Sequence, residues 1–171
     1  MNLLTKLEGI EEHRLSGTYP CRLPVWWART GEIGKQPNER GVSGRKIVMR
    51  IEKKFNRFER MLSKLFRAPK ELRRPLDTMN SMLWELCDGH RTFDEICNVM
   101  NATFHDEIAP VLHRTELAIS QFLQLNLMII KNEPLNGMWK VGPGMIPDGQ
   151  HLGKLTQPEH YNTELLGGEI P

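Results

Sequence analysis

The sequence has few of the features that mark secreted or membrane proteins. Its three cysteines, Cys21, Cys87 and Cys97, are too few and too widely spaced for a disulfide framework. No unbroken apolar run is longer than Leu127–Ile130, far short of the ~18 residues that span a bilayer. The first twelve residues contain three glutamates and no apolar stretch of the signal-peptide type. We therefore expect a soluble, cytoplasmic protein without a transmembrane segment.

The residue types that carry catalysis or hold metals are dispersed. The six histidines form no pair at a zinc-ligand spacing, and no CxxC or HxxxH motif occurs. We find no phosphate-binding loop, carboxylate pair or nucleophile–base arrangement. Cys87 and Cys97 fall within apolar helical patterns, where a free thiol is more often a packing group than part of a metal or redox pair. The sequence therefore predicts no enzyme, no catalytic residues, no cofactor and no metal site.

Glycine and proline are scarce in one stretch, and that stretch locates the domain. Only four of the 14 glycines and 11 prolines lie within residues 45–132. Both residues interrupt helices and strands, so we expect a folded domain over residues 45–142 after an irregular arm, residues 1–44. Residues 143–171 are predicted to form a flexible C-terminal tail, either mobile or draped over the surface. Trp26 and Trp27 indicate that the arm packs on the domain or on a partner.

Charge is also unevenly distributed. Residues 45–74 contain twelve Lys or Arg and three Glu, a net charge of +9, whereas the whole chain carries +2. Such a block suits either an anionic partner or intramolecular pairing with the acidic remainder of the chain. The candidate basic surface consists of Lys53, Lys54, Arg57, Arg60, Lys64 and Arg67.

Hydrophobic periodicity predicts the first elements of the domain. Residues 45–53 alternate between apolar and charged side chains, as in a half-buried strand. Residues 55–67 are predicted to form an inserted basic amphipathic helix, with Phe58 and Leu62 on one face and the cations on the other. Such a helix can lie on a membrane surface or bind a partner, but we favour an apolar face that covers the domain's own sheet. Residues 70–76 are predicted to form an edge strand, because proline suits an edge.

Capping residues predict three helices after this strand. Asp77 can cap the first helix, which is expected to end at Gly89, and Thr92 with Glu95 forms a capping box that opens the second. The segments 127–131 and 138–141 follow, joined through an Asn-Gly turn, and predict a C-terminal β-hairpin. The second and third helices are expected over residues 92–104 and 107–126. Together these elements predict an α+β, winged helix-turn-helix-like domain with short N-terminal β-strands, a three-helix core and the C-terminal β-hairpin.

A short pattern spans the first two predicted helices. It consists of W-x-L-x-D-G at the end of one helix and T-x-x-E-I at the start of the next. Its positions are Trp84, Leu86, Asp88, Gly89, Thr92, Glu95 and Ile96. Together with Phe122–Ile129, this pattern resembles the PqqD family over about residues 70–131. Taken by themselves, Trp84 is interpreted as core packing and Asp88-Gly89 as the turn that ends the helix.

The resemblance implies a peptide-recognition chaperone, also called a RiPP recognition element. Such proteins hold the leader of a ribosomally made precursor peptide and present it to a peptide-modifying enzyme, often a radical S-adenosylmethionine (radical SAM) enzyme. In the family, the leader adds as an extra strand to the edge of the N-terminal sheet, in the cleft beside the third helix. The resemblance therefore implies a non-catalytic adaptor whose partners are a precursor peptide and such an enzyme.

Strand addition takes its affinity from main-chain hydrogen bonds and its specificity from side-chain pockets. The expected edge is residues 71–76, where a bound strand would use the backbone of Leu72 and Arg74. Exposed cations on this edge suit a peptide with acidic residues, although charge there also commonly protects an exposed strand. The candidate peptide-binding residues on this edge and on the long third helix are Leu72, Arg73, Arg74, Leu76, Arg114, Leu117, Ala118 and Gln121.

A winged-helix nucleic-acid-binding protein is the alternative. A helix that reads DNA needs Arg, Lys, Asn or Gln on its exposed face. The second predicted helix has no cation, and the third offers only His113 and Arg114. The cations of residues 45–74 lie outside the helix-turn-helix, so we expect only weak, salt-sensitive phosphate contact by this basic segment.

Overall fold

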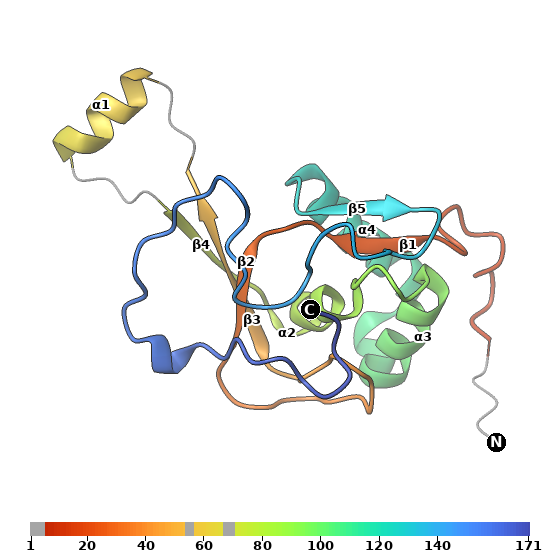
Figure 1. Ribbon diagram of the computed structural model, residues 1–171. Coiled ribbons are helices and arrows are strands. Elements are labelled where there is room, and N and C mark those ends of the chain that lie inside the picture. The colour runs from red at the N-terminus through yellow and green to blue at the C-terminus, as the bar shows by residue number, and fades with distance from the viewer. Residues whose placement is uncertain (1–5, 54–56, 67–70) are drawn as a thin grey trace.

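A computed structural model describes residues 6–53, 57–66 and 71–171 of the chain. The elements are β1 (Tyr19–Arg22), β2 (Trp26–Thr30), β3 (Lys46–Glu52), α1 (Arg57–Phe66), β4 (Glu71–Pro75), α2 (Thr78–Leu86), α3 (Phe93–Phe104), the 3-10 helix η1 (His105–Ile108), α4 (Val111–Gln124), β5 (Met128–Lys131) and the 3-10 helix η2 (Pro158–His160). They form a mixed α+β fold with two small antiparallel sheets (Figure 1). None of the helices in the described part of the chain is both long and apolar enough to span a membrane.

The larger sheet has the strand order β2-β3-β4, and its central strand has two different apolar faces. Ile47 and Met49 are fully buried in the core that α2, α3 and α4 share with the sheet. Val48 lies on the opposite face, in a smaller cluster with Trp26 and side chains of the C-terminal tail. The alternation of residues 45–53 therefore predicted the strand, but not its burial, because Val48 and Arg50 on the expected outer face are buried too. Strand β4 confirms the edge strand predicted within residues 70–76.

The prediction of an irregular arm over residues 1–44 misses β1 and β2. Strand β2 fits between Pro24 and Gly31, and its aromatic residues Trp26 and Trp27 favour a strand. Strand β1 contains Pro20, which a strand without neighbours on both sides tolerates. Trp27 is buried in the core, so the arm packs on the domain, as expected. At the arm's start, Ile10 and Leu15 are also buried in this core.

Capping chemistry sets the helix starts. The Asp77 carboxylate accepts the amide of Asn80 at the start of α2, and Thr92 and Glu95 form the predicted capping box of α3. Helix α2 ends at Leu86 rather than near Gly89, because the next residues leave the helix to approach β1. Gly89 itself has a φ of +79°, and a Cβ there would lie 2.7 Å from Cys21 Sγ. The third core helix is shorter than predicted, since η1 takes up the residues before it.

The C-terminal β-hairpin predicted over residues 127–141 does not form. Strand β5 pairs with β1 instead, placing Ile130 opposite Pro20 in the smaller sheet. Residues 138–141 are not a strand; there Trp139 Nε1 donates to the carbonyl of Arg22 at 2.9 Å. A partner from the N-terminal arm was not predictable from the local turn signal. The α+β class is confirmed, and the winged helix-turn-helix assignment stays a prediction.

The C-terminal tail lies along the outer edge of β2. The amide of Arg29 donates to the carbonyl of Asn162 at 2.9 Å, and the amide of Asn162 donates back at 2.8 Å. The tail therefore follows the draped alternative, and it occupies the β2 edge of the larger sheet. Strand β4 forms the opposite edge of that sheet.

The prediction that residues 55–67 cover the domain's own sheet is wrong. Figure 1 shows α1 standing away from the body, beyond the adjoining ends of β3 and β4. Phe58 is 65% exposed, although Leu62 is half-buried. Both faces of β2 and β3 are already covered, one by the core helices and the other by the tail. Lys54 and Arg67 of the candidate basic surface lie outside the described residues.

Candidate functional site

Two adjoining hollows lie beside α4. The larger, of about 530 Å³, opens between α2, η1 and α4, and the smaller, of about 360 Å³, lies between the end of β4 and α4. Both are lined by Asn80, Ala118 and Gln121, so they continue into one another. We call this combined depression the β4–α4 groove. Its small Ala118 side chain lies where the two hollows meet.

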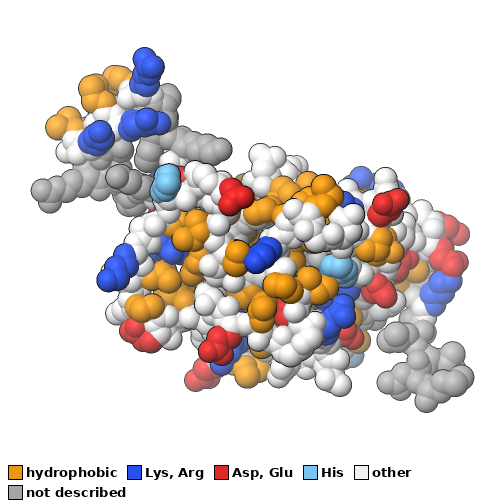
Figure 2. All heavy atoms as spheres, viewed as in Figure 1, with side chains coloured by type: hydrophobic (Ala, Val, Ile, Leu, Met, Phe, Trp, Pro, Cys, Tyr) orange, Lys and Arg blue, Asp and Glu red, His pale blue; other side chains and the backbone are white. Residues whose placement is uncertain are grey.

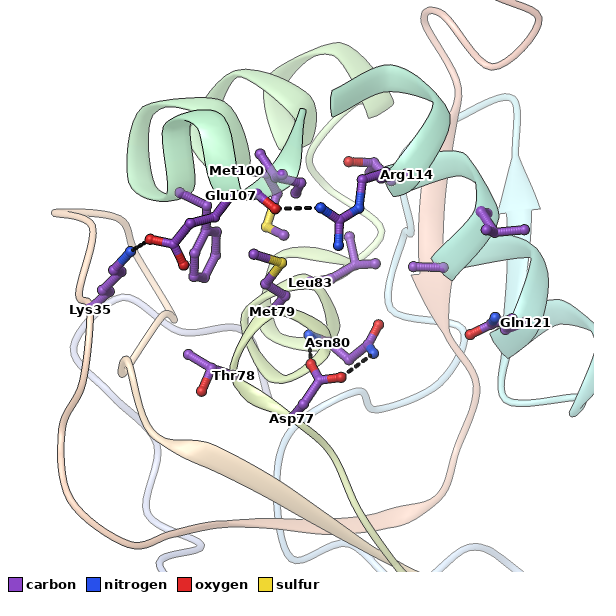
Figure 3. A pocket seen from close by; sticks show the side chains of 15 residues that line it. Lys35, Asp77, Thr78, Met79, Asn80, Leu83, Met100, Glu107, Arg114 and Gln121 are labelled. Carbon is purple, nitrogen blue, oxygen red and sulfur yellow. Dashed lines mark hydrogen bonds and ion pairs between the residues drawn. The ribbon is translucent and has the colours of Figure 1, made fainter. Parts of the chain in front are cut away.

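The larger hollow has an apolar floor and a polar rim (Figure 3). The floor is formed by Met79, Leu83, Met100 and Phe104. On the rim, Lys35 pairs with the carboxylate of Glu107, and Arg114 donates to the carbonyl of the same residue. A trough of this kind can accept an apolar side chain while its rim contacts polar groups.

Hydrogen bonds of Asp77 hold the start of α2 at the point where β4 ends, beside the groove. The amide of Asn80 donates to Asp77 Oδ1 at 2.8 Å, and its side-chain amide donates to Oδ2 at 2.9 Å (Figure 3). These bonds hold the first turn of α2 directly after β4, which keeps Leu76 beside the α4 side chains. The Asp77 cap predicted from the sequence thus helps to shape the groove.

Six of the eight candidate peptide-binding residues line this groove. Leu72 and Arg73 line neither hollow. Leu72 shares the side-chain face of Arg74 by strand alternation, but it lies farther along β4. The six that come together are Arg74, Leu76, Arg114, Leu117, Ala118 and Gln121.

The side chain of Arg73 points to the other face of the sheet. Its guanidinium lies 3.4 Å from the Tyr161 hydroxyl and 3.4 Å from the Thr156 hydroxyl, both in the C-terminal tail. It also lies 3.6 Å from Glu71. Arg73 and Arg74 therefore do not act as a pair: only Arg74 faces the groove.

The expectation that a bound strand would use the backbone of Leu72 and Arg74 is wrong. The amide of Leu76 donates to the carbonyl of Ile47 at 2.8 Å, so the backbone amide and carbonyl of Leu76 point toward β3. Backbone amide and carbonyl groups alternate in direction from one residue to the next along an antiparallel strand. The backbone groups of Leu72 and Arg74 therefore also point toward β3. The backbone groups of Arg73 face outward instead, together with the carbonyl of Pro75. Sequence alternation defines side-chain faces, but which set of amides pairs with β3 depends on the register.

Sequence reasoning missed several lining residues of the larger hollow. Lys35 belongs to the arm that was predicted to be irregular, and Glu107 was placed in the third helix rather than in η1. Met79 and Met100 were assigned to the helical core stripes, and this is confirmed: Met100 is buried in the core and Met79 packs against it. Both also line the groove, which the stripes did not indicate. An apolar stripe alone does not distinguish a core face from a groove floor.

The candidate basic surface is separate from this groove. Arg57, Arg60 and Lys64 lie on α1 and are exposed, as is Lys53 at the end of β3. None of these four lines either hollow of the groove. The basic block of residues 45–74 also contains internal pairing, because Arg50 contacts Glu71 at 2.8 Å.

The three thiols are buried, as expected for packing groups. Burial raises the pKa of Cys21 to about 11 and that of Cys97 to about 12, and it also raises the pKa of Cys87. The thiols are therefore protonated near neutral pH, whereas the thiolate is the reactive form. Among the described residues, no group of three His, Cys, Asp or Glu could hold a metal ion.

The β4–α4 groove combines three features suited to an extended polypeptide. They are the outward backbone groups of an edge strand, an apolar trough beside them, and cations at Arg74 and Arg114. In the described part of the chain, no acidic side chain forms an ion pair with Arg74. Comparisons of the chain with family models, curated proteins and solved structures found no match.

Proposed function

We propose that this chain is a non-catalytic peptide-binding adaptor. It holds an extended segment of a precursor peptide as a fourth strand on β4 and presents that peptide to a peptide-modifying enzyme, which in the PqqD family is often a radical SAM enzyme. The observation that carries the proposal is the β4–α4 groove, which lies alongside the outer edge of the sheet. The order of a three-stranded sheet followed by three core helices is compatible with that resemblance.

The groove supplies both parts of strand recognition. The outward amide and carbonyl of Arg73 can bond to the backbone of a bound strand, which gives affinity without regard to sequence. Successive side chains of a strand point to opposite faces, so alternate residues of the peptide would face α4. Those residues meet an apolar floor and the cations Arg74 and Arg114, an arrangement that favours apolar and acidic side chains.

The two edges of the sheet are not equivalent for this purpose. On β2, Arg29 exchanges two backbone hydrogen bonds with Asn162, so the tail already occupies part of that edge. The β4 edge adjoins hollows that side chains can enter, which supports β4 as the docking edge. If the cations of β4 served only to protect an exposed edge, no hollow beside them would be needed.

Blocking the groove from its helix side should weaken peptide binding. The probe is a peptide enriched from a displayed library of random sequences on the immobilised full chain, then titrated by calorimetry. Gln121 is exposed on α4 and lines both hollows, so Gln121→Trp should fill the groove without entering the core. We expect at least a tenfold loss of affinity, which is about 1.4 kcal/mol.

His113→Trp is the matched control for this substitution. His113 is also exposed on α4 but lines neither hollow, so this variant should bind the selected peptide like the wild type. Both variants should keep the wild-type circular dichroism. Equal affinity of the Gln121→Trp and wild-type proteins would place peptide binding outside the groove and contradict the proposal.

A further inference from the structure

Helix α1 exposes an apolar stripe that the folded body does not cover. Phe58, Met61, Leu65 and Phe66 are each more than half exposed, and they rank among the most exposed large apolar side chains of the described residues. In Figure 2 the apolar and basic side chains of α1 gather on a projection separate from the main body. Exposed apolar surface of this kind on a folded protein commonly marks an interaction site.

The stripe and the cations occupy opposite sides of the helix. At 100° per residue, the apolar residues from Phe58 to Phe66 cover one continuous arc. Arg57 and Lys64 lie together on the other side, with Arg60 near them. Helix α1 therefore presents an apolar face bordered by Arg57 and Lys64 on one side and by Glu59 on the other, and the helix carries more cations than anions.

We propose that α1 is a membrane-surface helix that binds anionic lipid headgroups. The helix lies in the plane of the bilayer surface, with the apolar stripe among the upper acyl chains. Arg57 and Lys64 extend their long side chains toward the lipid phosphates, as basic residues do at membrane interfaces. This surface is separate from the β4–α4 groove, and the proposal does not depend on peptide binding there.

Charge complementarity favours this occupant over three others. A nucleic-acid backbone would engage the cations but leave the apolar stripe in water. A second copy of α1 packed against the stripe would cover the apolar side but would not engage the cations on the opposite side of the helix. The larger sheet of the same chain is covered on both faces at β2 and β3, by the core helices and by the tail. An anionic bilayer satisfies both the apolar and the basic sides of the helix.

The test is sedimentation of the full chain with phosphatidylcholine vesicles, with and without phosphatidylglycerol. The wild type should bind the anionic vesicles at least tenfold more tightly than the neutral ones, and added salt should weaken that binding. Two double variants each remove one side of the helix: Phe58→Ser with Leu65→Ser, and Arg57→Gln with Lys64→Gln. Each should lose at least tenfold in binding to anionic vesicles.

Matched controls change the same residue types elsewhere on the surface. Ile33→Ser with Met138→Ser removes exposed apolar side chains, and Lys140→Gln with Lys154→Gln removes exposed cations, all outside α1. Both controls should bind like the wild type. All four variants should keep the wild-type melting temperature, because the substituted side chains are exposed.

Three results would overturn the proposal. The first is no binding to anionic vesicles, or losses in the controls equal to those in the α1 variants. The second is self-association of the wild type without vesicle binding, abolished by Phe58→Ser with Leu65→Ser, which would identify a second copy as the occupant. The third is duplex DNA binding that depends on Arg57 and Lys64 but not on the apolar stripe, without vesicle binding.

Discussion

Replacing Glu85 with alanine should lower the free energy of unfolding by about 3–5 kcal/mol, because it removes one of the two carboxylates that pair with the buried Arg29 and leaves the amide and hydroxyl of Ser43 without this acceptor. The Glu85 side chain is fully buried. It accepts from Arg29 Nε at 2.6 Å and from the amide and hydroxyl of Ser43 at 3.0 and 2.7 Å. Burial acts to lower the pKa of Arg29, but hydrogen bonds to Glu169 and Glu85 overcome it and raise that pKa.

The cluster around Glu85 joins four segments of the chain. Glu85 belongs to α2, Arg29 to β2 and Ser43 to the loop before β3, while Glu169 brings the C-terminal tail to Arg29 at 2.7 Å. Urea unfolding followed by circular dichroism measures the loss. Glu133→Ala removes an exposed carboxylate and should change stability by no more than about 0.5 kcal/mol. A loss at Glu85 no greater than at Glu133 would show that the buried cluster does not hold these segments together.

Trp27→Ala should destabilise the protein by about 3–5 kcal/mol, the usual range for removing a large aromatic side chain from a core. Trp27 is 1% exposed, and its Nε1 donates to the carbonyl of Val141 at 3.0 Å. Its ring meets that of Trp84 edge-on, with centroids 6.4 Å apart. The guanidinium of Arg22 lies 5.0 Å from the Trp27 ring centroid, which adds a cation–π contact.

This prediction tests whether the N-terminal segment is an integral part of the core. Thermal unfolding of the full chain is the measurement, and Trp139→Ala is the control, because Trp139 is only partly buried. The control should cost less than Trp27→Ala. A similar melting temperature for Trp27→Ala and the wild type would mean that the segment before residue 45 adds little to the stability of the domain.

The sequence predicted those parts of the fold that local chemistry determines. The Asp77 cap and the Thr92–Glu95 capping box depend on side chains within one helical turn, and both occur. The alternation of residues 45–53 predicted β3, since a strand with two different faces carries a period of two. The apolar core stripe of α3 could also be predicted from the sequence, and its residues Ile96 and Met100 are buried.

Features that depend on distant partners could not be predicted in this way. Strand β5 pairs with β1, more than a hundred residues earlier, and no local signal distinguishes that pairing from a hairpin with residues 138–141. Helix α1 has the same amphipathic pattern whether its apolar face covers a sheet or faces solvent. Only the tertiary structure reveals that the core helices and the tail already cover both faces of β2 and β3.

In the candidate groove too, local patterns predicted some residues and distant contacts determine the others. The residues on β4 and α4 were identified from the resemblance together with side-chain alternation, and six of them line one depression. Arg73 was assigned to that groove because it is charged and lies on the edge strand, but its side chain contacts Thr156 and Tyr161 on the other face. Lys35 enters the rim from a loop far away in sequence, so no pattern near β4 could have indicated it.

The most direct test of strand addition removes one outward amide from β4. Arg73→Pro deletes an N–H that faces away from β3, and proline is tolerated on edge strands, so the sheet should remain intact. Arg73→Ala removes the same side chain but keeps the amide. Titration of both variants with the library-selected peptide should show that Arg73→Ala binds nearly as tightly as the wild type, whereas Arg73→Pro loses at least about tenfold. Equal affinities of two folded variants would contradict binding of the peptide as a fourth strand on β4.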